Sequence, residues 1–588
     1  MNEMVLSQPG EAGSQRNGLV IAAVMLALFV SSFSQTVAGT ALPRIIGELG
    51  GISLYSWVLI ASMLAATAVT PLVGKLSDLY GRKVFLMGGI ALFMAASALT
   101  GAAQNMVQLI SFRAVQGLAS GTIMASAFAT IGDLFPPAER GRYFGLFTGV
   151  FAVASITGPL LGGFLTDYWG WRWVFYVNLP LGFLALAVLA RGLPAGRITP
   201  RSEPIDWLGM ATLLWCVVPL LFALAWAGDR FPWGSWEIGV LLLVAALGLL
   251  AFLAAERWAA DPVLPLFLLR NRTFVVASLM SFLTGMGLFA SLSYMPLYIQ
   301  GTLGASATNS GLVNMPLMVG LAAASMVAGH LASRTGHYRW TVVTGSAILV
   351  GGMAITLSFD VQTALVVPVA VMVVVGLGLG LSMPLLGVAV QNALSDRMLG
   401  VASASTQFFR EIGGTLGIAL SGTLITAQLH QHLSSRLPPD VADGAPDELV
   451  RQLEDPRILL SPSALERMRE AFSALGADGP ALYTQTVGAM RSVLADGLHE
   501  VFLVGLVVAL LVFATSILLP EVPLRTRETH PVEERLTHPG FAWGEAALVM
   551  EGRALQDVEL AASALFDDGE MPAPAIERPS AGIGVPGG

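Results

Sequence analysis

Hydrophobic positions along this chain gather into long runs that are separated by short polar segments. A helix of about 20 apolar residues crosses the hydrocarbon core of a bilayer, because each residue adds about 1.5 Å. Runs of this length occur at residues 18–41, 54–74, 84–104, 106–131, 143–166, 173–190, 207–227, 238–255, 273–299, 308–331, 340–358, 361–390, 401–427 and 501–520. The pattern predicts an all-α polytopic membrane protein with about fourteen transmembrane helices in contact with the lipid bilayer.

Basic residues in the short loops predict the orientation of these spans. The segment Gly74–Lys83 contains Arg82 and both lysines of the chain, and it separates two apolar runs. Because Lys and Arg are enriched in cytoplasmic loops, this segment is expected on the cytoplasmic face. The opposite short loops contain only Arg44, Arg172 and Arg230, which agrees with this orientation. An even number of spans then puts both termini in the cytoplasm.

Composition supports a membrane protein and narrows the possible functions. Of 588 residues, 55% are hydrophobic and only 12% are charged, whereas soluble domains have about 25% charged residues. No basic patch suggests a nucleic-acid partner. The phosphate-binding pattern G-x-x-x-x-G-K-[ST] does not occur, and the spans contain no nucleophile–base pair or set of metal ligands. We therefore expect neither an ATP-driven pump nor an enzyme, and no metal or other cofactor.

A faint internal repeat predicts how the spans are grouped. Gly, Leu and Gly recur at the same offsets in Gly74–Gly81 and in Gly329–Gly336, which indicates a duplicated chain. The expected parts are an N-terminal segment (1–17), a six-helix bundle (18–192), a linker with two inserted helices (193–272), a second six-helix bundle (273–520) and a polar tail (521–588). An outer loop at 428–499 contains an amphipathic stretch, Ser463–Leu475, that predicts a small helical cap. The composition of the tail predicts disorder.

Three charged residues lie deep within the predicted spans: Arg113, Arg410 and Glu411. A charge at the centre of a bilayer costs at least ~2.5 kcal/mol on insertion scales, so such residues are expected to face a cavity or a partner. They are candidates for gating and coupling, and the alternative is a structural tie between helices. Whether Arg410 holds Glu411 ionised is left open by the sequence.

The fifth span has a face of small residues. Gly149, Gly158, Gly162 and Gly163 would let a neighbouring helix approach closely, and Pro159 would free a backbone carbonyl and permit a bend. This composition favours a hinge or a seal between helices. Close packing without motion is the alternative.

Four segments, in order along the chain, resemble signatures of the major facilitator superfamily. They are the loop between spans two and three (Gly74–Lys83), the start of a span-four signature (Arg113–Gly117), an antiporter signature in span five (Gly149–Gly163) and the opening of span six in fourteen-span drug:proton antiporters (Trp171–Pro180). The resemblance covers about residues 18–520. It implies two six-helix bundles with two extra helices between them, around a central cavity that opens alternately to each side.

The same resemblance implies a function and roles for particular residues. Asp78 and Arg82 would form a latch at the inner gate, and Arg113 and Gln116 would belong to the coupling machinery. The implied activity is export of lipophilic or cationic small molecules in exchange for protons, by a monomer in the cell membrane of a bacterium. An exporter of a lipid or an endogenous metabolite, or a non-transporting membrane sensor of the same fold, are the alternatives.

In one position the chain departs from this family pattern. Relatives usually carry an aspartate in span one, where this chain reads Phe33-Ser34-Gln35-Thr36. Glu411 is the natural substitute for that acid as a proton carrier. Ser34 and Gln35 lie at a depth similar to that of Arg113, so these residues could meet.

Residues suited to flexible hydrophobic cargo complete the set of candidates. Aromatic, amide and thioether side chains in spans nine and ten could line the cavity, and they are Phe282, Phe289, Tyr294, Tyr298, Asn314 and Met315. The alternative is that these side chains face lipid or other helices.

Overall fold

The computed structural model describes residues 11–49, 57–192, 206–227, 230–259, 262–304, 307–395, 398–442, 459, 462–473 and 479–524. Almost all of these residues are helical, and within these ranges the only β-contact is an isolated bridge between Ala227 and Phe231. Thirteen of the described helices are long and apolar enough to cross a membrane. The all-α polytopic fold predicted from the sequence is therefore confirmed.

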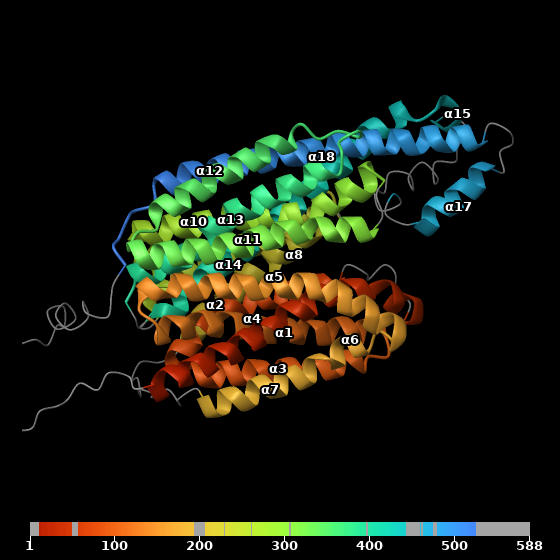
Figure 1. The fold of residues 1–588 in the computed structure, drawn as a ribbon. Helices are drawn as coiled ribbons and strands as arrows, with labels where there is room; N and C mark the ends of the chain where they lie inside the picture. Colours follow the sequence, from red (N-terminus) through yellow and green to blue (C-terminus); the bar gives the residue numbers. More distant parts are fainter. Residues whose placement is uncertain are drawn as a thin grey trace, which may run out of the picture. The chain divides into compact units, whose positions relative to one another are not determined.

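The first bundle is formed by the N-terminal helices, coloured red to orange in Figure 1. They are α1 (Glu11–Leu49), α2 (Trp57–Tyr80), α3 (Arg82–Gly101), α4 (Met106–Leu134), α5 (Pro137–Tyr168), α6 (Trp173–Tyr176) and α7 (Asn178–Gly192). Helix α1 packs on α5 and α7, and α4 packs on both α2 and α3. The predicted sixth span is divided into α6 and α7, because Pro180 has no N–H to bond the carbonyl of Tyr176.

The second bundle is coloured yellow-green to blue in Figure 1. It consists of α10 (Arg272–Leu297), which continues into a π-helical turn η3 (Tyr298–Thr302), and of α11 (Ala307–Thr335), α12 (Arg339–Thr356), α13 (Val366–Ala393), α14 (Leu399–Arg436) and α18 (Gly479–Ile517). Helix α12 is the predicted span that is missing from the thirteen. It has only 18 residues and starts with Arg339, but it packs on α13 and α18 as a bundle member.

Two further helices, α8 (Trp207–Trp226) and α9 (Trp236–Trp258), come between the two bundles in sequence. They pack on each other. Helix α8 contacts α2 of the first bundle and α14 of the second. The ring of Trp57 lies 5.6 Å from that of Phe222, and the Trp233 indole N–H donates to the Thr423 hydroxyl over 2.5 Å. The inserted pair therefore covers the seam between α2 and α14.

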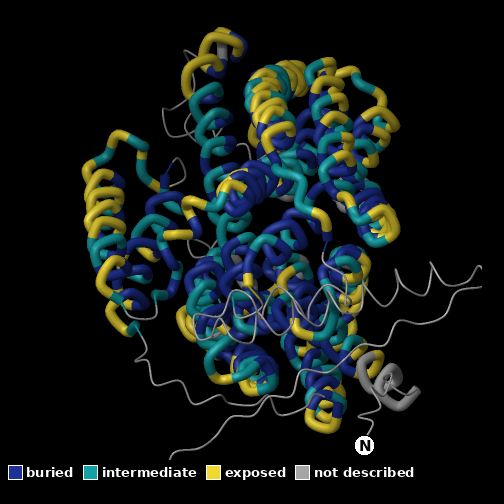
Figure 2. Tube along the Cα trace, turned by 90° about the vertical axis from the view of Figure 1, so that its left-hand side faces the viewer, coloured by how far each residue is buried: buried dark blue, intermediate teal, exposed yellow. Residues whose placement is uncertain are grey.

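The two bundles meet along two helix pairs, α5 with α11 and α2 with α14. Figure 2 shows the helices end-on, with buried residues between the helices and exposed residues on their outer faces. We call the end where α2 passes into α3 the Gly81 end. Gly81 has φ of 92°, which favours glycine because a Cβ would be strained there.

Helices extend into parts of the chain that were predicted to be loop. Helix α14 continues to Arg436 and α18 begins at Gly479, so both enter the predicted outer loop. Apolar side chains at helical spacing explain the extension, since Leu429 and Leu433 of α14 share a core with Met490 of α18. Helices α15 (Pro439–Ala442) and α17 (Pro462–Ser473) lie at the end where α14 stops and α18 begins (Figure 1). Helix α17 is at the position of the predicted helical cap.

Only the first residues of the predicted disordered tail are described. Glu521 accepts the Tyr338 backbone N–H over 3.2 Å, and the Leu524 N–H donates to the Gly336 carbonyl over 3.2 Å. Burial raises the pKa of the Tyr338 phenol, whose hydroxyl donates to the Pro520 carbonyl. Residues 521–524 thus pack against the α11–α12 turn, and the predicted disorder of residues 525–588 lies outside the described residues.

Candidate functional site

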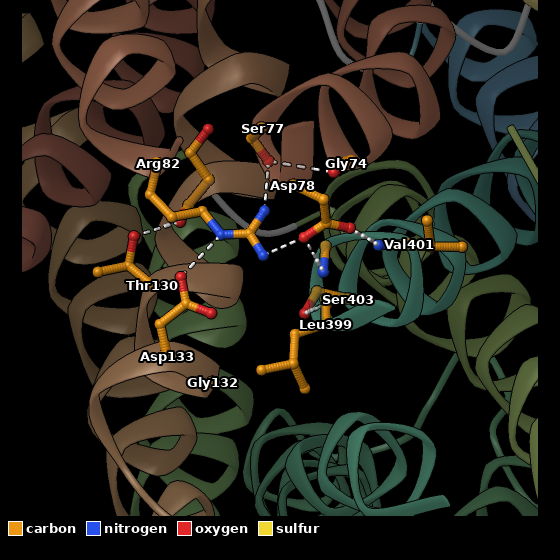
Figure 3. Close-up of polar contacts among 12 residues, drawn as sticks. Gly74, Ser77, Asp78, Arg82, Thr130, Gly132, Asp133, Leu399, Val401 and Ser403 are labelled. Atoms are coloured by element: carbon orange, nitrogen blue, oxygen red, sulfur yellow. Dashed lines mark hydrogen bonds and ion pairs between the residues drawn. The ribbon is translucent and has the colours of Figure 1, made fainter. Parts of the chain in front are cut away.

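At the Gly81 end, Asp78 joins the two bundles. Its Oδ1 accepts the backbone N–H of Gly400 over 3.0 Å, and its Oδ2 accepts that of Val401 over 3.2 Å. These N–H groups belong to the first turn of α14, where a helix has unpaired donors and a partial positive charge. Figure 3 shows the carboxylate between Arg82 and this turn. Asp78 therefore caps a helix of the opposite bundle.

Arg82 supports the capping carboxylate from the first bundle. Its guanidinium forms an ion pair with Asp78, bonds Asp133 Oδ2 over 2.9 Å and donates to the Ser77 hydroxyl over 2.6 Å (Figure 3). The Asp78 side chain is only 5% exposed, whereas that of Asp133 is 40% exposed. The arginine thus compensates for the burial of the Asp78 charge.

Backbones approach closely on both sides of this contact. A Cβ on Gly74 of α2 would lie 2.4 Å from the Cβ of Ala404 in α14. On the other seam, a Cβ on Gly145 of α5 would lie 2.6 Å from the Ser325 carbonyl oxygen of α11. Both seams are therefore closed at the Gly81 end. We call Gly74, Asp78, Arg82, Gly400 and Val401 the gate.

The small residues of α5 contact two different helices, α1 and α11. A Cβ on Gly158 would lie 2.1 Å from Thr36 Oγ1 in α1, while one on Gly149 would lie 3.1 Å from the Met326 methyl group in α11. Gly162 is buried, and α5 remains helical through Pro159. Gly158 thus permits the close approach of α1 and α5.

Arg113 is buried within the first bundle, where it is 1% exposed. It donates to the carbonyls of Val58 (3.1 Å) and Ser34 (3.4 Å) and to Gln116 Oε1 (2.8 Å). Gln116 in turn donates to the Ser97 hydroxyl over 2.6 Å. Among the described residues, no acidic side chain forms an ion pair with Arg113. These bonds connect α1, α2, α3 and α4, so Arg113 and Ser34 do meet, away from the central cavity.

A cavity of about 150 Å³ lies between the two bundles. It is lined by α1, α2, α4, α5, α10, α11, α13 and α14, and its lining residues are Leu28, Ser31, Ser32, Gln35, Met63, Ala66, Ser120, Gly121, Met124, Phe128, Phe147, Thr148, Phe151, Leu288, Phe289, Leu321, Met383, Gln407, Arg410 and Glu411. Of the residues predicted from the sequence, Gln35, Phe289, Arg410 and Glu411 therefore share one cavity.

Glu411 and Arg410 are the charged residues in this lining. Glu411 Oε1 accepts the Gln407 side-chain N–H over 2.5 Å, and Thr67 of α2 lies close to the same carboxyl group. Glu411 Oε2 is buried and has no hydrogen-bond partner among the described residues. A proton could therefore be added to Oε2 without breaking the bond to Gln407. This makes Glu411 suited to alternate between a charged and a neutral form.

Other residues predicted to line the cavity lie elsewhere. Ser34 contacts Arg113 through its carbonyl, and Phe282 packs in a core shared by both bundles. The remaining four belong to the second bundle and lie outside this lining. Tyr294 donates a hydrogen bond to the Ile418 carbonyl (2.8 Å), and Tyr298 donates one to the Asp360 carbonyl (2.7 Å). Asn314 donates one to the Leu292 carbonyl (3.1 Å), and Met315 is half-buried. The polar tips of the two tyrosines and of Asn314 thus bond backbone carbonyls within the second bundle, outside the cavity lining.

Sequence reasoning missed several lining residues. Gln407 precedes Glu411 by one helical turn, and this spacing alone could have identified it as a partner. Phe128, Phe147 and Phe151 supply the aromatic surface instead of the tyrosines. Their rings come from α4 and α5, and an apolar aromatic residue in a span carries no signal that distinguishes cavity from lipid.

Two helical bundles that meet along paired seams, with a charged cavity between them, define a secondary-transporter fold. The Major Facilitator Superfamily model matches residues 24–418, and the chain belongs to this family. The chain is 35% identical to "Multidrug transporter protein MdtP" of Bacillus subtilis, covering 90% of this chain and 98% of that protein. It is 36% identical to "Multidrug resistance protein 3" of the same organism, covering 69% of this chain and 79% of that protein.

Among solved structures, the human organic anion transporter MFSD10 has a similar fold. The two structures superpose with a TM-score of 0.52 and 16% sequence identity, covering 85% of this chain and all of MFSD10. At this identity the likeness concerns the fold. The chain is accordingly a transporter of the Major Facilitator Superfamily and not an enzyme.

Proposed function

We propose that this protein is a multidrug efflux transporter that exports lipophilic small molecules from the cell in exchange for protons. The observation that carries the proposal is the central cavity, in which one carboxyl group and one guanidinium face an aromatic and methionine-rich surface. Aromatic and thioether side chains adapt to apolar cargo of different shapes. The names of the bacterial relatives, a multidrug transporter and a multidrug resistance protein, support the same cargo class.

Glu411 is the group that carries the coupling proton in this proposal. A proton crossing a membrane potential of about 100 mV supplies ~2.3 kcal/mol, which can sustain a roughly fifty-fold cargo gradient. An ionised carboxylate resists passage through an occluded state, so loading and release of a proton would control when the transporter changes state. Arg410 either tunes this titration or holds Glu411 as a fixed counter-charge for cationic cargo.

The gate and the cavity share helices, which suggests how the two are coupled. Helix α14 carries Val401 at the gate and Glu411 at the cavity, separated by about 15 Å along the helix axis. Helix α2 likewise carries Asp78 at the gate and Met63 in the cavity lining. A rigid tilt of either helix would therefore change gate and cavity together.

The proposed location is the cell membrane, with the Gly81 end and both termini in the cytoplasm. The distribution of arginines supports this orientation. The proposed functional unit is the monomer, in which the two bundles of one chain form the cavity between them. The orientation is tested by labelling a Tyr80→Cys variant, in a Cys216→Ala background, with an impermeant thiol reagent in intact cells and in inverted vesicles. Labelling in intact cells would contradict it.

Reconstitution with an imposed pH gradient tests the transport proposal. Purified protein in liposomes is given one lipophilic neutral dye, one lipophilic cation and one sugar phosphate as a polar control. We expect uphill movement of a lipophilic compound that stops when a protonophore collapses the gradient, and no movement of the sugar phosphate. Movement of both dyes only down their own gradients would contradict proton-driven export.

A further inference from the structure

A second cavity, of about 650 Å³, lies at the Gly81 end where the inserted helix pair joins the second bundle. Its walls come from α2, the end of α9, the 3₁₀ helix η2 (Leu266–Arg270) and the start of α14. The lining residues are Lys75, Asp78, Glu256, Arg257, Pro262, Pro265, Leu266, Phe267, Arg270, Ser395, Met398 and Val401. We call this cavity the linker pocket.

The linker pocket combines three cations with two acids, of which Asp78 has partners at both carboxylate oxygens and Glu256 at one. Asp78 is paired with Arg82 and bonds two backbone N–H groups. Glu256, which is 4% exposed, accepts the backbone N–H groups of Val263 (3.1 Å) and Leu264 (3.2 Å) through Oε1, whereas its buried Oε2 has no hydrogen-bond partner among the described residues. Lys75 lies close enough to act on the Glu256 charge.

The remaining two cations are Arg257 and Arg270. Both are exposed, and neither forms an ion pair with another described residue. Two more acids and one more arginine are close to the lining residues in sequence. They are Asp261, Asp396 and Arg397, which lie outside the described residues. A planar guanidinium offers paired N–H donors that fit the oxygens of a phosphate group.

Apolar side chains are exposed at the same end of the inserted pair, and one of them, Phe267, lines the linker pocket. Large hydrophobic side chains at this end of the inserted pair are highly exposed: Trp207 (67%), Trp258 (85%), Phe267 (59%) and Leu269 (52%). Trp side chains at helix ends are typical of the membrane interface, where the ring contacts the acyl chains and the N–H contacts water. A basic pocket at this end can hold a phosphate while these exposed side chains contact lipid tails.

We propose that the linker pocket binds the phosphate headgroup of an anionic phospholipid from the adjacent leaflet and thereby stabilises the closed gate. Basic pockets between transmembrane helices at the cytoplasmic side are typical headgroup sites. Two gate residues on opposite bundles, Asp78 and Val401, form part of the wall, so the pocket has this shape only while the gate is closed. A ligand that binds only this shape shifts the population toward the closed gate. The assignment of the leaflet and the effect on the gate rest on the proposed function, whereas lipid binding itself does not.

The binding part is tested by native mass spectrometry of delipidated protein titrated with phosphatidylglycerol, phosphatidylcholine or inorganic phosphate. The test variant is Arg257→Gln/Arg270→Gln. The matched control is Arg142→Gln/Arg334→Gln. It removes two exposed arginines that lie at the same end of the protein but do not line the linker pocket. We expect the affinity for phosphatidylglycerol to fall about tenfold or more in the test variant only, because each basic residue contributes to headgroup attraction.

The gate part is tested by spin labels at Tyr80→Cys and His337→Cys, one in each bundle, in a Cys216→Ala background. In bilayers with phosphatidylglycerol, the population with the longer label distance should be about five times larger in the test variant than in the control variant. In phosphatidylcholine alone, the two variants should give the same distance distribution. Unchanged lipid affinity in the test variant, or occupancy by inorganic phosphate equal to that of the lipid, would overturn the site. Reduced lipid affinity with unchanged label distances would overturn the link to the gate. Neither binding result depends on transport activity, so failure of the proposed function is recognised separately.

Discussion

Replacement of Asp78 by Asn tests whether the capping contact holds the gate closed. The two carboxylate oxygens accept separate N–H groups, from Gly400 and Val401. The Asn side chain has a single carbonyl oxygen, so one of these two backbone N–H groups would face the amide NH₂ and have no acceptor. The other N–H would bond a neutral oxygen instead of a charged one. Hydrogen bonds to charged groups contribute about 1.5–3 kcal/mol each, so the closed gate should lose about 2–4 kcal/mol in total. Because 1.4 kcal/mol is a factor of ten, its population relative to the open gate should fall roughly 30- to 700-fold.

The assay combines label distances with transport. With the label pair at Tyr80→Cys and His337→Cys, Asp78→Asn should move most molecules to a longer distance and abolish most uphill transport, with folding and membrane insertion retained. Asp133→Asn is the matched control. Asp133 also pairs with Arg82, but it is partly exposed, and the Gly400 and Val401 N–H groups of α14 bond Asp78 instead, so its loss should change the gate by less than about 1 kcal/mol. Wild-type distances and rates in Asp78→Asn, or equal effects of both variants, would refute the reasoning.

Three further substitutions test other parts of the structure. Gly158→Leu should stop exchange of thiol accessibility between the two ends during turnover, because a Cβ there would lie 2.1 Å from an atom of α1, whereas Gly163→Leu, with open space around its Cβ, should not. Arg113→Gln should lower the thermal unfolding midpoint, since a buried carbonyl without a donor costs about 1–3 kcal/mol; an unchanged midpoint would argue against the tie between helices. Hydrogen bonds from the Trp171 indole and a neighbouring arginine hold the pKa of Glu48 below its usual value. Its stabilising effect should therefore be present at neutral pH and disappear as pH falls through that lowered pKa, and unfolding curves of Glu48→Gln should lack this acid-dependent loss.

The helical spans could be predicted because the thickness of a bilayer sets the length of an apolar run. The limits of the prediction appear where packing extends a helix beyond the membrane, as in the contact of Leu433 in α14 with the α18 core. The partner of Asp78 could not be predicted either. It consists of backbone N–H groups more than 300 residues away in sequence, which have no side-chain signature.

For the candidate site, the sequence identified charges better than surfaces. Arg410 and Glu411 were predicted because a charge in an apolar span needs an aqueous or polar environment. Which aromatic rings face the cavity depends on the rotation of each helix, and this is decided by packing. Tyr298 illustrates the difference: its hydroxyl bonds a carbonyl within the second bundle and its ring stacks on Phe359 at 5.2 Å, so it serves the core.

The most direct test of the account is proton flux in a Glu411→Gln variant, reconstituted and measured with one neutral and one cationic cargo. Gln imitates the protonated carboxyl permanently, so the variant should still bind both cargoes but lose cargo-dependent proton movement and uphill transport. Glu500→Gln is the control, since Glu500 bonds Gln428 outside the cavity lining and should behave as wild type. If Glu411 is instead a fixed counter-charge, only affinity for the cationic cargo would fall. Full retention of proton-coupled transport of both cargoes in Glu411→Gln would contradict the account.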